Sequence, residues 1–542
     1  MAYIDRYLHD RTLILLSNRE PYEHVVRDGE VTVRRPAGGL VSALDPTMQH
    51  THGTWVAWGS GAADAEMADR DGRLMVPPEN PSYTLRRVWL SEDDIEGYYL
   101  GFANSVLWPI CHMLIQHLEV RDEHWRCYQE VNRRFAAAVA DEARRASGAP
   151  MVWIQDYHFA LVADELRRQV PDAFIHQFWH IPFPPLDILG LLPAPVLEAV
   201  LRGMLGNDLL EFHTRRYAMN FLSCVEYFIP EARVRRSSLS VEYDGREVSL
   251  GVFPISIDVE HYENLASSAV SDERVRELRE QYAAGKHQLG ISVDRVDYTK
   301  GIPERLHALD LLWEQYPELR GAFTVILVAT PSRTDLDAYR QLEADVISTV
   351  AEINHRYGGS EWTPIVLINE NVSAELLASI YRAADLCMVS SLQDGMNLVA
   401  KEFIACQTDE CGVLVLSKFT GAAEAMEGAV LINPFNVDGF VAGIRTALEM
   451  SPEERKRRMQ RMRVQLHDTT IFDWLGAILA RASELMSERN ERLTAVMPRP
   501  SRGAVPRTEG SDRGVADGPP PRSTGVEGSG RVGRDLGGLA RP

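Results

Sequence analysis

The sequence lacks long apolar runs, since no stretch approaches the roughly 18 consecutive apolar residues that a membrane-spanning helix needs. The N-terminus also lacks the basic and then apolar pattern of a secretion signal, because the apolar stretch at 13–16 is only as long as a strand. Cysteine is scarce, with six in 542 residues and no CxxC spacing, which disfavours a disulfide framework. We therefore expect a cytoplasmic protein with reduced thiols and no membrane partner.

Basic residues are in deficit: 57 Lys and Arg face 77 Asp and Glu, which gives a formal net charge of −20. This balance argues against a nucleic-acid or anionic-membrane partner. If the substrates are phosphorylated, the net negative charge of the protein repels them. Arginines and lysines close to the site must then bind them. No HExxH motif and no DxD after a strand is present, so we expect neither a metal nor a cofactor.

A chain of this length exceeds what one hydrophobic core holds, so two large domains are expected. Short apolar runs alternate with amphipathic helical patterns, which predicts an α/β protein with parallel sheets and helices on both faces. A strand ending in Pro254 marks a boundary between domains 1–254 and 255–466. An amphipathic helix is predicted within 467–490, and a Pro-, Gly-, Arg- and Ser-rich disordered tail at 491–542. The predicted strands are 12–16, 150–154, 173–179, 251–254, 288–293, 322–327, 365–368, 386–389 and 412–416, and the clearest helical patterns are 125–146, 304–315 and 333–355.

Two cations follow the strand predicted at 288–293, in the stretch SVDRVDYTKGIPER. Arg295 offers a bidentate fork and Lys300 a point charge, a combination that suits a diphosphate beyond the carboxyl end of a strand. Surface salt bridges with Asp294 and Asp297 are an equally simple interpretation of the same spacing.

A second polar stretch, SLQDGMNLVAKEF at 391–403, follows the strand predicted at 386–389. Asp394 and Gly395 predict a turn, and a helix beginning near Met396 would present free amides to an anion or a sugar. Glu402, about two turns along, is placed to pair with ribose hydroxyls. Alternatively, Asp394 only caps the helix and Glu402 is a solvated helix residue.

In the first half, polar residues again end predicted strands. His180, in QFWHIPFPPLD, can donate to a sugar hydroxyl or be a satisfied structural histidine. Asp156, in VWIQDYH, can anchor sugar hydroxyls. Gly38 and Gly39 permit close backbone approach to a ligand.

Two aromatic residues in YLGFANSVLWP at 99–109, Tyr99 and Trp108, could lie against a sugar ring. Aromatic residues at this spacing also occur in cores, so both interpretations stay open.

These motifs occur together and in order, and the sequence resembles the retaining, GT-B-type trehalose-6-phosphate synthase family from about 13 to 474. The resemblance implies two doubly wound Rossmann-like domains facing a central cleft. The first would bind the acceptor and the second the nucleotide sugar, with the helix at 467–490 crossing back onto the first. The segments that carry the resemblance are SNR (17–19), AGGLVSAL (37–44), GFANSVLWP (101–109), QDYH (155–158), HIPFP (180–184), DRVDYTKGIPERL (294–306), PSR (331–333), DGMNLVAKEF (394–403) and GVLVLSKFTGAA (412–423).

The resemblance implies roles for single residues, with Arg295 and Lys300 on the donor diphosphate and Glu402 on the donor ribose. The catalytic set it implies is His180, Arg295, Lys300 and Asp394. The donor-binding set is Gly38, Gly39, Arg295, Lys300, Asp394, Gly395, Met396, Asn397, Leu398, Val399 and Glu402. The acceptor-binding set is Arg19, Tyr99, Trp108, Asp156 and Arg333.

The implied reaction moves glucose from UDP-glucose, or another nucleoside diphosphate glucose, to glucose 6-phosphate with retention, as the first step of trehalose biosynthesis. In the family's front-face mechanism the leaving phosphate deprotonates the incoming hydroxyl, so no enzyme carboxylate attacks. A homo-oligomer is expected, and a separate trehalose-6-phosphate phosphatase would act downstream.

Three alternatives stay open: a glucosylglycerol-phosphate synthase that uses glycerol 3-phosphate, a non-catalytic sugar-phosphate sensor, and a polymer-extending transferase of the same fold. Departures from the family pattern cluster in the acceptor half. Glu20 replaces an apolar residue, Gln155 replaces a frequent histidine, and the loop at 20–35 is longer than in short bacterial members. Acceptor identity is therefore less securely implied than donor chemistry.

Overall fold

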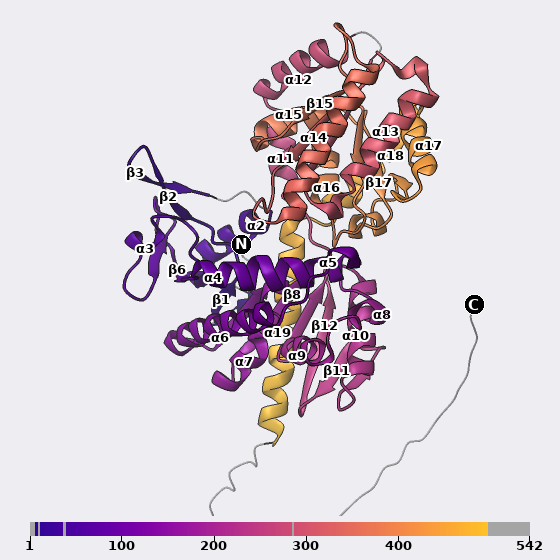
Figure 1. Ribbon diagram of the computed structural model, residues 1–542. Helices are drawn as coiled ribbons and strands as arrows, with labels where there is room; N and C mark the ends of the chain where they lie inside the picture. The colour runs from indigo at the N-terminus through magenta and orange to yellow at the C-terminus, as the bar shows by residue number, and fades with distance from the viewer. Residues whose placement is uncertain (1–5, 9–10, 36–38, 285–286, 497–542) are drawn as a thin grey trace, which may run out of the picture. The chain divides into compact units, whose positions relative to one another are not determined.

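The computed structural model describes residues 6–8, 11–35, 39–284 and 287–496 (Figure 1). The chain divides into two compact units, 1–490 and 491–542. Within the first unit lie two main sheets, one built before residue 253 and one after residue 287. The domain boundary expected at 254–255 falls between these sheets and stays a prediction. Among the described residues, no helix is both long and apolar enough to cross a membrane.

The first sheet has ten strands in the order β10-β11-β12-β9-β8-β7-β1-β4-β6-β5. Its centre is parallel and almost wholly buried, as expected for strands covered on both faces. The edges carry antiparallel pairs, β5 with β6 and β10 with β11 with β12, which a purely parallel prediction omits. The strands are β1 (Thr12–Leu16), β4 (Thr54–Trp58), β5 (Arg73–Val76), β6 (Tyr83–Val88), β7 (Pro150–Gln155), β8 (Phe174–Trp179), β9 (Leu209–Phe212), β10 (Arg233–Arg235), β11 (Ser240–Tyr243) and β12 (Arg246–Val252).

Alternate residues of these strands enter different cores, because successive side chains point to opposite faces. Ile14 and Leu16 pack with the helices of one face, whereas Leu13 and Leu15 pack toward α2 on the other. The helices of this half are α2 (Gly39–Thr51), α3 (Asp64–Met67), α4 (Glu92–Asp94), the π-helix η1 (Ile95–Leu107), α5 (Trp108–Cys111), α6 (Asp122–Arg145), α7 (Val162–Gln169), α8 (Leu186–Leu189), α9 (Ala194–Met204) and α10 (Arg215–Phe228).

The second sheet has six parallel strands in the order β15-β14-β13-β16-β17-β18. Helices α13, α14 and α17 bury one face, and α11, α15, α16 and α18 bury the other. The strands are β13 (Gln288–Arg295), β14 (Phe323–Thr330), β15 (Ile365–Ile368), β16 (Leu386–Val389), β17 (Val413–Ser417) and β18 (Val430–Ile432). The helices are α11 (Val259–Ala266), α12 (Ala269–Tyr282), α13 (Ile302–Gln315), α14 (Asp337–Tyr357), α15 (Ala374–Ala383), α16 (Leu398–Cys406), α17 (Val437–Leu448) and α18 (Pro452–His467).

A last helix, α19 (Ile471–Val496), carries the amphipathic pattern predicted within 467–490 and runs six residues past it. The disordered tail predicted from residue 491 is therefore wrong at 491–496, and the rest of that prediction lies outside the described residues. Its Trp474 ring lies 5.7 Å from the ring of Trp153 and 5.2 Å from that of Phe178, on the first sheet. The start of α19 therefore packs against strands β7 and β8.

Most predicted elements differ from the structure by one to three residues at an end, and two differ more. The strand predicted at 251–254 is wrong in extent: β12 spans Arg246–Val252, and Pro254, which has no N–H to donate, lies outside it. The helix predicted from residue 333 begins at Asp337, because Arg333 has a φ of 48° and belongs to the preceding loop. An exposed hairpin, β2 (Glu23–Arg27) with β3 (Glu30–Arg34), occupies the long loop at 20–35.

Candidate active site

The best-defined contact among the predicted site residues joins Lys300 to Asp394. Lys300 ends the short 3₁₀-helix η4 (Tyr298–Lys300) after β13, and Asp394 follows β16, the neighbour of β13 in the sheet. Nζ of Lys300 lies 2.7 Å from Oδ2 of Asp394, and the side chains are 14% and 13% exposed. Burial alone would raise the pKa of Asp394, but the charge of Lys300 and its hydrogen bond hold it at about 2. Asp394 therefore stays ionised at neutral pH.

Arg295 ends β13 as an exposed side chain, and it has no ion-pair partner among the residues the structure describes. The carboxylates that the salt-bridge interpretation offered are occupied elsewhere. Asp294 pairs with Arg305 at 2.7 Å, and Asp297 pairs with Arg333 at 3.0 Å. The guanidinium of Arg295 thus remains available to an anionic ligand.

The turn after β16 is fixed by side-chain contacts. Asn397, at a φ of 84°, caps α16 by accepting from the backbone N–H of Ala400, so the cap is Asn397 and not Asp394. The Asn397 amide also donates to Oδ2 of Asp394 at 3.2 Å. Asp394 is thereby held as a buried acceptor at the head of the helix.

Gly395 lies against the backbone of His180, and this contact joins the second-sheet loop to the end of β8. A Cβ placed on Gly395 would lie 2.1 Å from the carbonyl oxygen of His180. Only glycine permits so close an approach of two backbones.

We expect Gly395→Ala to lower both stability and activity, because the methyl group overlaps a backbone oxygen that cannot move as a side chain does. Overpacking of this kind costs about 1–3 kcal/mol. Thermal denaturation and initial rates measure the change. The matched control is Gly359→Ala, where a Cβ meets nothing within 4 Å. Equal melting temperatures for the two variants would contradict the packing assigned here.

Glu402 lies on α16 and is not the solvated residue that the alternative interpretation described. The hydroxyl of Tyr381, on α15, donates to its Oε2 at 3.1 Å. Burial raises the pKa of Glu402, and hydrogen bonds from Tyr262 and Tyr381 oppose that rise. The carboxylate is therefore oriented by tyrosines, with no cation paired to it in the described residues.

His180 and Asp156 lie side by side at the ends of β8 and β7. Oδ1 of Asp156 accepts from the backbone N–H of His180 at 3.1 Å, and Nε2 of His180 is 2.9 Å from Oε1 of Gln155. Burial, with the nearby His213, lowers the pKa of His180 well below its usual range, so the ring is neutral. Burial also raises the pKa of Asp156, to about 7.

Arg333 is the centre of a second cationic group. Its guanidinium lies 4.1 Å from the ring centroid of Trp108 and donates to Asp297 at 3.0 Å. A weaker contact of 3.4 Å reaches the hydroxyl of Tyr157. The side chain is 7% exposed, and its Nε is buried without a hydrogen-bond partner in the described residues. Trp108 therefore faces a guanidinium and is not merely a core residue.

Tyr99 and Arg19 belong to the same region. Tyr99 lies on η1, with its ring 6.0 Å from that of His158 and 5.8 Å from that of Trp58. Burial would raise its pKa, but the charges of Arg333 and Arg19 lower it, so both cations lie close to its hydroxyl. The side chain of Arg19 is exposed. Gly38 lies outside the described residues, and Gly39 begins α2.

Sequence reasoning missed three residues that organise this group. Asp297 accepts from Trp108, Thr299 and Arg333, although it was considered only as a surface partner. Its position between Arg295 and Lys300 was the available signal. Tyr157, within the segment QDYH, and Tyr339 contact Arg333, and neither was singled out from the sequence.

The unusual Glu20 is fully buried beside Arg19. Its carboxylate accepts from Arg87 at 2.7 Å and from the backbone N–H of Ser60 at 2.9 Å. Burial raises the pKa of Glu20 to about 8, in a cluster that also contains Asp64. The residue that departs from the family pattern thus fixes the backbone from which Arg19 projects.

Comparisons with known proteins show which family this chain resembles. The model of glycosyltransferase family 20 matches residues 11–484. A trehalose-6-phosphate synthase of Mycolicibacterium gilvum is 37% identical over 473 residues, covering 86% of this chain and 92% of that protein. An alpha,alpha-trehalose-phosphate synthase (UDP-forming) A of Dictyostelium discoideum is 36% identical over 485 residues, and the match covers 89% of this chain but 64% of that longer protein.

A solved structure described as trehalose-6-phosphate from E. coli bound with UDP-2-fluoro glucose is similar in fold. It matches with a TM-score of 0.76 and 31% identity, covering 87% of this chain and 99% of that one. The α/β, GT-B architecture implied by the sequence is therefore confirmed. Since the family model spans most of its length, the chain belongs to glycosyltransferase family 20.

Proposed function

We propose that this family 20 glycosyltransferase is an α,α-trehalose-6-phosphate synthase. It transfers glucose from UDP-glucose to glucose 6-phosphate and retains the anomeric configuration. The observation that carries the proposal is a concentration of four cations in a protein of net charge −20. Arg295 and Lys300 lie at and after the end of β13, close to Asp297. Arg333 and Arg19 lie close to Tyr99. Four cations suit two anionic substrates, a nucleoside diphosphate sugar and a sugar phosphate.

The donor half of the proposal rests on the carboxyl ends of β13 and β16. There Lys300 has ammonium hydrogens beyond the one given to Asp394. Within the described part of the chain, Arg295 has no ion-pair partner. Both would neutralise the departing diphosphate as its charge develops. Glu402 would take the ribose hydroxyls, and the backbone from Gly395 to Val399 would lie along the transferred sugar. The names of similar proteins support UDP as the nucleotide.

The chemistry proposed needs no carboxylate nucleophile. Asp394 is engaged with Lys300 and Asn397, and His180 is neutral, so each is suited to hydrogen bonding to the glucose. The leaving phosphate would accept the proton of the attacking hydroxyl on the same face of the sugar. Catalysis would then come from positioning and from charge stabilisation of the diphosphate.

The acceptor half of the proposal rests on Arg333, Arg19, Tyr99, Trp108 and Asp156. A panel of UDP-, GDP- and ADP-glucose against glucose 6-phosphate and glycerol 3-phosphate tests it, with nucleoside diphosphate release as the readout. Glucose 6-phosphate is expected to give the highest kcat/KM. Turnover with glycerol 3-phosphate alone would favour a glucosylglycerol-phosphate synthase, and no release with any pair would favour a sugar-phosphate sensor.

Asp156 makes acceptor binding depend on pH. Its raised pKa of about 7 leaves the carboxyl half protonated near neutrality, whereas sugar hydroxyls that donate to it favour the charged form. Acceptor affinity should therefore fall as the pH drops through 7, by about tenfold between pH 8 and pH 6. KM profiles of the wild type and Asp156→Asn test this, because the ionisation of the substrate affects both alike. Parallel profiles would contradict the role given to Asp156.

The remaining proposals concern the setting of the enzyme. We place it in the cytoplasm as a homo-oligomer, and a separate phosphatase would remove the phosphate of the product. Size-exclusion chromatography with light scattering tests the oligomeric state.

A further inference from the structure

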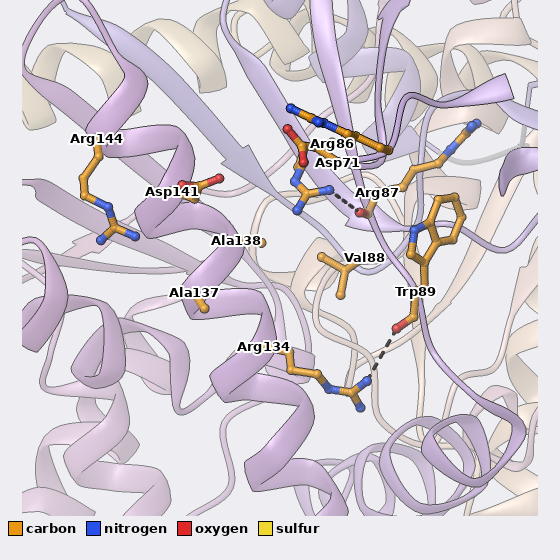
Figure 2. Close-up of a pocket in the computed structure, with 11 residues that line it drawn as sticks. Asp71, Arg86, Arg87, Val88, Trp89, Arg134, Ala137, Ala138, Asp141 and Arg144 are labelled. Atoms are coloured by element: carbon orange, nitrogen blue, oxygen red, sulfur yellow. Dashed lines mark hydrogen bonds between the residues drawn. The ribbon is translucent and has the colours of Figure 1, made fainter.

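Away from the candidate active site, a cavity of about 500 Å³ lies between β6 and α6, and arginines dominate its wall (Figure 2). Arg86 reaches it from β6, and Arg134 and Arg144 reach it from α6. Arg70 contributes from the loop before β5. Such a concentration of positive charge is unexpected in a protein of net charge −20.

The carboxylates in and around the cavity wall neutralise only some of these arginines. Asp71 and Asp141 pair with Arg73 at 3.0 and 3.1 Å, and Arg73 is not part of the wall. Arg70 and Arg144 are exposed and make no ion pair with any described residue. Because Arg86 faces Glu142 and Arg134 pairs with Asp94, the positive charge that lacks a carboxylate partner among the described residues is that of Arg70 and Arg144.

Arg86 and Arg134 hold unused hydrogen-bond donors. Nε of Arg86 is buried without a hydrogen bond, and the Glu142 carboxylate lies 3.7 Å away. Nε of Arg134 is likewise buried and unbonded, although the end of that guanidinium pairs with Asp94. Unpaired buried donors cost free energy, which a bound anion would recover.

The shape of the cavity follows from small residues and one indole. Ala137 and Ala138 sit between Arg134 and Arg144 on one stretch of α6, so no long side chain fills the space (Figure 2). Trp89 is 41% exposed at the wall, and its indole N–H has no hydrogen-bond partner in the described part of the chain. A flat apolar surface beside several guanidinium groups suits a ring that carries phosphate.

The cavity is one residue away from the network that holds Arg19. Neighbouring strand residues point to opposite faces, so Arg86 faces α6 while Arg87 points away and pairs with Glu20. Trp89 provides a second connection, because its ring packs on Gly59, which precedes the Ser60 amide bound by Glu20. These contacts connect Arg86 and Trp89 with the backbone next to Arg19.

We propose that this cavity is an effector site for a compact phosphorylated metabolite, and that its occupancy changes the affinity for the sugar-phosphate acceptor. The phosphate would bind Arg86, Arg134 and Arg144, and a sugar or base ring would lie on Trp89. The proposed binding of a phosphorylated metabolite does not depend on the proposed function. The proposed change in acceptor affinity rests on it.

Inorganic pyrophosphate is a suitable first probe. It is titrated by calorimetry into the full-length Lys300→Ala protein, because this variant weakens binding of pyrophosphate at the proposed donor site. Arg86→Gln and the double variant Arg70→Gln/Arg144→Gln in this background should each weaken binding at least about tenfold, because charge-assisted hydrogen bonds are lost. The matched control is Arg133→Gln, on the same helix but 51% exposed and paired with Glu130. It should bind as its parent does.

The proposed site would be wrong if both cavity variants bound pyrophosphate as tightly as the Lys300→Ala parent. It would also be wrong if that parent bound no pyrophosphate up to about 10 mM. Arg70 and Arg144 are exposed, so the double variant still tests the site if Arg86→Gln misfolds. Thermal denaturation shows whether each variant is folded. In the Lys300-containing enzyme, pyrophosphate should alter the KM for glucose 6-phosphate only while the cavity arginines are intact. Equal responses of wild type and double variant would overturn the coupling. If the wild-type protein showed no transferase activity but the cavity variants still lost pyrophosphate binding, only the proposed function would be contradicted.

Discussion

Lys300→Ala should lower kcat by about 10²–10³-fold while the protein remains folded. The ammonium group is proposed to stabilise the diphosphate as it leaves, and loss of one preorganised donor in such a role costs roughly 3–4 kcal/mol. Removal of the cation also leaves Asp394 buried without its 2.7 Å partner, so the pKa of that carboxyl rises from about 2. Steady-state kinetics with saturating UDP-glucose measure the loss.

The control for this substitution is Lys456→Ala on α18. Lys456 has a 62% exposed side chain and contacts Glu410 only at 3.8 Å, so its removal changes the same charge without touching the site. Full activity is expected of that variant. If Lys300→Ala also kept its kcat, the proposed charge stabilisation would be wrong.

Arg333→Lys should raise the KM for glucose 6-phosphate by ~30–100-fold and leave the KM for UDP-glucose within about twofold. Lysine keeps the charge but loses the planar fork that stacks on Trp108 and donates to Asp297 and Tyr157. The effect is therefore expected on the acceptor phosphate rather than on the fold. Separate KM values for the two substrates distinguish the roles.

Arg340→Lys provides the matched control for this second variant. Arg340 lies on α14, with an exposed side chain paired to Asp337. Its replacement should change neither KM. A rise in both KM values for Arg333→Lys would indicate a general structural role and contradict the assignment to the acceptor.

Much of the fold could be predicted because its signals are local. The central strands are continuous apolar runs, and β1 and β16 match their predicted bounds. Strands near the sheet edges gave weaker signals: β6, next to the edge strand β5, contains Arg87, which is buried although periodicity alone does not mark it so. Arg87 can be buried because the folded chain brings Glu20 and Asp64, which are distant in sequence, next to its guanidinium group.

The candidate site was predictable where residues follow strands. Lys300 and Asp394 are 94 positions apart, yet the neighbouring parallel strands β13 and β16 bring them together. The partner of each residue was not predictable. Asp297 could pair with Arg295, Lys300 or Arg333, and three-dimensional packing selects Arg333. Glu20 was recognised as a departure, but its partner Arg87 lies 67 residues away.

The central claim is the transfer of glucose with retention between two anionic substrates. The most direct test is to incubate the full-length protein with UDP-glucose and glucose 6-phosphate and to identify the product by mass and anomeric coupling. We predict stoichiometric UDP and trehalose 6-phosphate with α configuration at both anomeric carbons. A product with a β linkage from the donor glucose, or no transfer to glucose 6-phosphate, would contradict the account.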